Sequence, residues 1–132
     1  MRRTAFLLPV ALMCALACVA TAQNAQNLQI SKGPVLEMVG DNSAVIAWST
    51  NVAGSTVLKY GTDPSNLTQT AQAPWGGTTH RVTLSGLQPN TMYYFQVESG
   101  QAQGTGTGAL SKVDSFQTVA QGAQPKHYPP IK

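Results

Sequence analysis

Polar and apolar residues alternate with a period of two along much of the chain, and this alternation predicts β-strands. In residues 43–50 (SAVIAWST) it places Ala44, Ile46 and Trp48 on one face. The same pattern predicts further strands at residues 34–39, 55–60, 79–84, 91–98 and 111–118. Short strands separated by turn residues, with no long helical stripe after residue 22, favour an all-β antiparallel sandwich.

The inward-facing positions of these strands are expected to fill one small core, with little space left for a buried pocket. Pro34 has no N–H to donate, so it is expected at the start of a strand or on a sheet edge. The expected core consists of Leu36, Ile46, Trp48, Leu58, Tyr60, Val82, Leu84, Leu87, Tyr93, Phe95, Val97 and Phe116.

The first 22 residues have the order of a secretory signal peptide. Two arginines follow Met1, residues 5–20 carry no charge, and Ala20-Thr21-Ala22 is an A-x-A cleavage site. The uncharged run is shorter than the ~20 residues that a membrane-spanning helix needs. We therefore expect cleavage after Ala22 and a secreted or periplasmic protein.

Residues 15–18 (ALAC) offer an alternative, because they resemble a bacterial lipobox. Cleavage there would leave a lipid-anchored protein that begins at Cys18, and an uncleaved anchor is a third alternative. Both cysteines, Cys14 and Cys18, precede Ala22. After cleavage at either site we expect no internal disulfide and no catalytic cysteine.

The charge of the chain gives no sign of nucleic-acid binding. The 132 residues carry a net charge of +3, and removing the two charges of Arg2 and Arg3 leaves +1. Charged residues make up 10% of the sequence, too few for a highly charged disordered chain. Residues 23–30 read as a linker, residues 31–120 as the domain, and residues 121–132 as a Pro-rich disordered tail with polyproline character.

The segment from Leu87 to Val97 (LQPNTMYYFQV) resembles the E–F corner of fibronectin type III domains, with Leu87, Tyr93 and Phe95 at typical apolar and aromatic positions. The resemblance covers residues 31–120 and implies an immunoglobulin-like sandwich of about seven strands. It also implies that Tyr93 forms a tyrosine corner, with its hydroxyl bonded to nearby backbone. Trp48 resembles the tryptophan of strand B in that family.

Three shorter segments resemble the fibronectin-like N-terminal domain of purple acid phosphatases. They are residues 47–50 (AWST), 58–61 (LKYG) and 80–87 (HRVTLSGL). The resemblance implies a domain that precedes a separate two-metal phosphoesterase domain, which holds the metal ligands. Since the sequence ends at Lys132, we expect no such ligands, and therefore no catalytic residue, cofactor or metal.

The residue inventory supports a non-enzymatic interpretation independently. A two-metal site needs several His and carboxylate ligands in a fixed arrangement. His80 falls in a predicted strand, where we expect a partly buried structural role, and His127 falls in the predicted tail. The glycine-rich stretch 100–108 lacks the Lys-Ser/Thr and the helix of a phosphate-binding loop.

Trp75 is the candidate surface residue, because it lies between Pro74 and two glycines, outside any strand pattern. It is expected to fold back over the edge of the core; the alternative is an exposed ring that stacks on a sugar or anchors a partner. Tyr94, outward-facing on its strand, is a candidate to join it in an aromatic patch.

These observations favour an exported, non-catalytic fibronectin type III-like module for interaction or spacing at the cell envelope, with an unidentified protein or glycan as partner. Two alternatives remain. One is an orphan or truncated N-terminal domain of a metallophosphoesterase, and the other is a carbohydrate-binding sandwich that uses Trp75.

Overall fold

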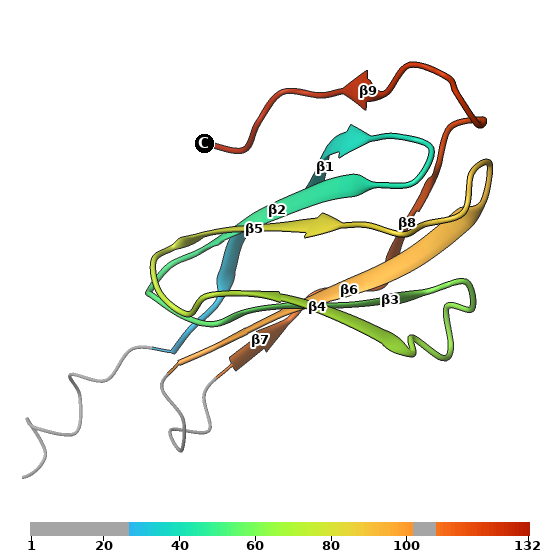
Figure 1. The fold of residues 1–132 in the computed structure, drawn as a ribbon. Helices are drawn as coiled ribbons and strands as arrows, with labels where there is room; N and C mark the ends of the chain where they lie inside the picture. Colours follow the sequence, from blue (N-terminus) through green and yellow to red (C-terminus); the bar gives the residue numbers. More distant parts are fainter. Residues whose placement is uncertain (1–26, 102–107) are drawn as a thin grey trace, which may run out of the picture.

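The computed structural model describes residues 27–101 and 108–132, which form two antiparallel β-sheets and no helix (Figure 1). The described residues contain nine strands: β1 Ile30–Val39, β2 Ala44–Thr50, β3 Thr56–Gly61, β4 Gln69–Ala73, β5 Thr79–Leu84, β6 Met92–Gly100, β7 Gly108–Leu110, β8 Asp114–Gln117 and β9 Lys126–His127.

The two sheets pack against each other as a sandwich. One sheet has the order β5-β2-β1-β9, and the other has the order β4-β3-β6-β7, with β8 also paired to β6. β7 and β8 pair with opposite ends of β6, since Leu110 lies opposite Glu98 whereas Phe116 lies opposite Tyr93. The all-β sandwich expected from the alternation is confirmed.

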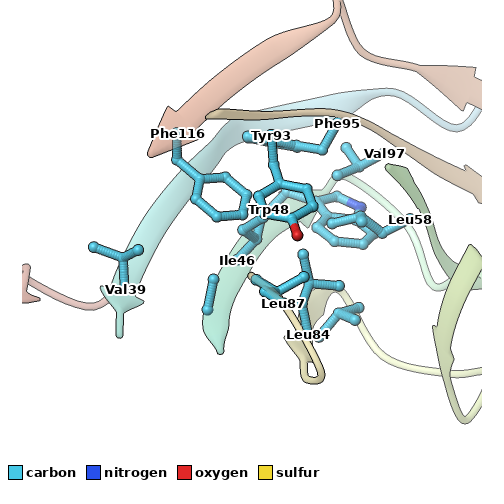
Figure 2. Packing of buried hydrophobic residues seen from close by; sticks show 12 residues of the cluster. Val39, Ile46, Trp48, Leu58, Leu84, Leu87, Tyr93, Phe95, Val97 and Phe116 are labelled. Carbon is cyan, nitrogen blue, oxygen red and sulfur yellow. The ribbon is translucent and has the colours of Figure 1, made fainter. Parts of the chain in front are cut away.

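The core lies between the two sheets, with Trp48 among side chains from both of them (Figure 2). Trp48 is completely buried, and Leu87, Tyr93 and Phe95 are buried with it. Ten of the twelve expected core residues are buried, and the other two, Leu36 and Tyr60, are partly buried and pack against the cluster.

Strand β1 departs from simple alternation. Strict alternation would place Leu36 and Val39, which are three residues apart, on opposite faces of the strand. Val39 is nevertheless fully buried in the core, and Leu36 is partly buried against the same core. The register between β1 and β2 slips between Leu36 and Met38. A bulge of this kind reverses which face the following residues take, so Val39 rather than Met38 points inward.

Strand β4 was not expected, because its sequence QTAQA has neither β-branched nor aromatic residues apart from Thr70. Its five residues pair along β3, from Gln69 opposite Tyr60 to Ala73 opposite Thr56. Most of its side chains are exposed or half-buried. Backbone pairing with β3 therefore stabilises β4, whereas the intrinsic β-propensity of its residues does not favour a strand.

The strand expected at residues 111–118 is present only as the shorter β8, and a separate short strand, β7, precedes it. Ser111 lies between them and donates its backbone N–H to the Val97 carbonyl, 3.0 Å away. Its side-chain oxygen accepts the Val97 N–H, also at 3.0 Å. The Ser111 side chain replaces a backbone carbonyl as the acceptor, so the Val97 N–H of β6 stays bonded although no strand continues from β7 to β8.

The expectation of a disordered tail at residues 121–132 is wrong for this structure. Lys126 and His127 form β9 against Val39 and Met38 of β1. The expected linker is also partly integrated, because Leu28 is buried and Asn27 and Gln29 bond to Asn51. Backbone pairing to β1 holds the C-terminal segment, whereas bonds to Asn51 and the burial of Leu28 hold the end of the linker. The alternation of polar and apolar residues does not indicate such hydrogen bonds.

Candidate functional site

The loop that carries Trp75 is attached to the turn between β2 and β3. Gly76 donates its N–H to the Gly54 carbonyl at 3.0 Å, and Gly54 donates its N–H to the Gly77 carbonyl at 3.2 Å. Both loop glycines have positive φ angles, 130° and 73°, which favour glycine. Trp75 is 57% exposed. The expected folding back over the core is therefore wrong, and the ring is available at the surface.

Tyr94 does not join Trp75 in an aromatic patch. It lies opposite Gly61 at the end of β3, whereas Gly54, to which the Trp75 loop is bonded, precedes the start of β3. The two aromatic residues thus lie toward opposite ends of the same strand, roughly 20 Å apart at about 3.3 Å per residue. Tyr94 is half-buried on the outer face of β6.

Tyr93 forms the corner that the sequence predicts. Its hydroxyl accepts the backbone N–H of Gln88 at 2.8 Å. The Gln88 carbonyl in turn accepts the Thr118 hydroxyl at 2.6 Å. These bonds tie the turn before β6 to the residue that follows β8, so the corner acts as a structural clamp.

His80 is the one buried histidine among the described residues, at 1% exposure. The Thr50 hydroxyl donates to the Val52 carbonyl at 2.7 Å, so its oxygen accepts the Nε2–H of His80 at 2.8 Å. Burial lowers the pKa of His80 below its usual 6.5, which favours the neutral ring. In the neutral ring with Nε2 protonated, Nδ1 carries no proton and accepts the Thr56 hydroxyl at 2.7 Å.

The indole of Trp48 lies beside this histidine. The two rings stack with centroids 5.5 Å apart, and the indole N–H donates to the Ser99 hydroxyl at 2.8 Å. Sequence reasoning placed His80 in a strand but missed its threonine partners, because they come from β2 and β3. The polar side chains of this network bond to one another inside the sandwich.

The carboxylates do not gather into a metal site. Within residues 27–101 and 108–132, no group of three or more His, Cys, Asp or Glu side chains is arranged to hold a metal ion. Glu37 forms a bidentate pair with Arg81, and this hydrogen bonding lowers the pKa of Glu37 and raises the pKa of Arg81. The Asp63 carboxylate accepts bonds from Ser65, which lower its pKa.

The sequence of residues 32–118 matches the family model of the purple acid phosphatase N-terminal domain. The chain belongs to this family. Its three characteristic segments form parts of β2, β3 and β5 and the turn that follows β5. In this purple acid phosphatase N-terminal domain Trp48 of the first segment stacks on His80 of the third, and Leu58 of the second belongs to the same core cluster as Trp48. The three segments therefore contribute to packing within the sandwich.

Solved structures confirm the fold of this purple acid phosphatase N-terminal domain. The fibronectin type III domain from human KIAA0970 protein is similar, with a TM-score of 0.52, 16% identity, and coverage of 78% of this chain and 84% of that one. The sensor domain of the anti-sigma factor RsgI4 from Pseudobacteroides cellulosolvens has a TM-score of 0.50 at 16% identity, covering 82% of this chain and 92% of that one. No curated protein matches the chain.

The part of the domain that the structure describes contains no helix long and apolar enough to cross a membrane. The predicted signal peptide, residues 1–22, lies outside the described residues, and so do residues 23–26, the first half of the predicted linker. The signal peptide stays a prediction.

Proposed function

We propose that this purple acid phosphatase N-terminal domain acts as an exported, non-catalytic module for interaction or spacing at the cell envelope. The main support for this proposal is the complete core of the sandwich, in which both ring nitrogens of His80 form hydrogen bonds with buried threonines. Hydrolysis of phosphate esters by a two-metal mechanism requires ligands held around two ions. The described carboxylates lie on separate strands and turns, and Glu37, Asp41 and Asp63 accept bonds from Arg81, the C-terminal segment and Ser65.

We expect the isolated chain to release no p-nitrophenol from p-nitrophenyl phosphate between acidic and neutral pH, with Fe, Zn or Mn added. Mass spectrometry of the exported protein should show a chain that begins at Gln23. Turnover that follows the protein through two different columns would contradict the non-catalytic role. A start at a lipid-modified Cys18 would contradict cleavage after Ala22 and place the domain on a membrane surface.

Association with a metallophosphoesterase domain is the first alternative, and family membership supports it. Sequencing the transcript beyond the codon of Lys132 tests it. A reading frame that continues into a metallophosphoesterase domain would replace the independent module with an enzyme-associated one.

Glycan binding is a second candidate, favoured by the exposed Trp75 on its attached loop. We expect Trp75→Ala to weaken binding to a glycan array by about tenfold or more, as for an aromatic anchor at a binding centre. Met92→Ala is the control, because Met92 is also exposed but lies far from the Trp75 loop. The turn that holds this loop bonds to Gly100 through Ser55, and Met92 is at the other end of β6 from Gly100. Equal binding by both variants and the parent would exclude Trp75 as the anchor.

A further inference from the structure

Residues 121–132, here called the C-terminal strap, run antiparallel along β1 at the edge of the four-stranded sheet (Figure 1). After the two residue pairs of β9, Tyr128 donates its N–H to the Glu37 carbonyl at 3.0 Å. Further along, the Ile131 side chain lies beside Gly33, and the Lys132 carbonyl accepts the Lys32 ammonium at 3.2 Å. The strap thus follows β1 from Val39 back to Lys32.

Glu37 is the main attachment point. Its side chain is only 9% exposed, and its Oε2 accepts both Arg81 Nη2 at 3.0 Å and the Ile131 N–H at 2.8 Å. Its Oε1 accepts Arg81 Nε at 2.6 Å. The ion pair holds the carboxylate in position on the outer face of the sheet, where the strap reaches it.

The strap is recognised mainly through its backbone. Every side chain from Gln121 to Pro130 is exposed, and only Ile131 is half-buried. The contacts to β1 are ladder pairs and backbone N–H donors at Tyr128 and Ile131, on either side of Pro129 and Pro130. An edge that binds backbone in this way is a site for strand addition, because main-chain bonds supply the affinity.

The contacts that the strap itself makes with this edge indicate an occupant for it. The sequence known to suit this edge is the strap itself, and a second copy of the chain carries the same sequence. The Glu37 and Asp41 carboxylates accept the backbone N–H groups of Ile131 and Gly122, and the Lys32 ammonium donates to the Lys132 carbonyl. The connection from β8 contains a turn closed by the Ala123 N–H on the Ala120 carbonyl, with Gly122 bonded to Asp41. This turn lies on the exposed surface and contains no core residue.

We propose that the outer edge of β1 is a strand-addition site that binds the strap of a second copy of this chain when its own strap is displaced. The interaction is an exchange of identical segments between two copies, which adds no new contact but joins two domains. It does not depend on the role proposed above, since it requires neither export nor an outside partner.

The first test measures binding of a fluorescent peptide of residues 121–132 to the full chain by anisotropy. The chain's own strap competes at an effective concentration in the millimolar range. A full chain with Tyr128→Pro and Ile131→Pro loses both N–H donors, so its own strap no longer competes with the peptide for the edge of β1. We expect the peptide to bind this variant at least tenfold more tightly than the wild-type chain.

Matched peptides separate backbone recognition from side-chain recognition. A peptide with Tyr128→Ala keeps the N–H donor and should bind like the wild-type peptide, whereas Tyr128→Pro should weaken binding about tenfold. Glu37→Ala in the strap-defective chain should weaken binding as well. A strap-defective chain that keeps the wild-type melting temperature and does not bind the peptide would overturn the proposal.

The second test concerns the second copy itself. Light scattering of the wild-type full chain should show a dimer fraction that rises with concentration up to about 1 mM, the range of the effective concentration. Excess free peptide should lower that fraction, and the Tyr128→Pro, Ile131→Pro chain should remain monomeric. A wild-type chain that stays monomeric throughout, or a dimer that is insensitive to the peptide, would overturn the exchange.

Discussion

Replacing Trp48 by alanine should cost about 3–5 kcal/mol of folding free energy, the usual range for deleting a large aromatic side chain from a core. Trp48 is completely buried and contacts the core from both sheets. The substitution also leaves the Ser99 hydroxyl without its indole donor and His80 without its stacking partner. A domain of this size has a total stability of roughly 5–15 kcal/mol, so the variant should be close to unfolding.

Urea denaturation followed by far-UV circular dichroism measures this effect. Trp75→Ala is the matched control, because it makes the same change at the other of the two tryptophans in the sequence. Since Trp75 is 57% exposed, its removal should change stability by no more than about 0.5 kcal/mol. Equal costs for the two variants would mean that Trp48 does not occupy the centre of the core.

The central strands of the fold were predictable because one of their faces is buried. In β5 and β6 the burial alternates strictly, and a period of two identified Val82 and Phe95 as core residues. In β2 both faces are largely buried, but the same period placed Trp48 in the core. Alternation fails where the ladder is irregular. In β1 the register slips after Leu36, so the residues that follow point to the opposite faces of the sheet from those that a period of two predicts.

The edges of the sheets were not predictable in the same way. β4 and β9 bury few side chains, so neither shows a hydrophobic pattern. Both are held by backbone pairing to a longer strand, which depends on the three-dimensional position of an edge. Proline-rich composition predicted a disordered tail, and composition does not reveal that β1 and Glu37 would bind this segment.

The exposure of Trp75 depended on bonds between loops. Its position outside the alternation was visible in the sequence, but the bonds of Gly76 and Gly77 to Gly54 join segments about 20 residues apart. His80 shows the same limit. Its burial follows from alternation, whereas its threonine partners come from two other strands and appear only once these are paired.

Acidification should destabilise the domain through His80. Its pKa in the folded state lies below the usual 6.5 because burial disfavours the imidazolium. Above pH 6.5 the folded and unfolded chains both hold this ring neutral, so its contribution to stability is complete. As the pH falls below 6.5 the unfolded chain binds a proton that the folded chain does not. Stability is then lost by up to about 1.4 kcal/mol per pH unit until the folded pKa is reached.

Urea denaturation at a series of pH values from 8 to 5 tests this expectation. Thr50, Thr56 and Trp48 surround the ring and do not titrate in this range. The Glu37 carboxyl loses its contribution only below its own reference value of 4.5, so the two effects are separate. His80→Gln should remove the slope between pH 6.5 and 5, whatever its cost at pH 8. His127→Gln should keep that slope, because His127 is exposed on β9. A slope that survives His80→Gln and disappears with His127→Gln would show that the buried ring is not the group that titrates.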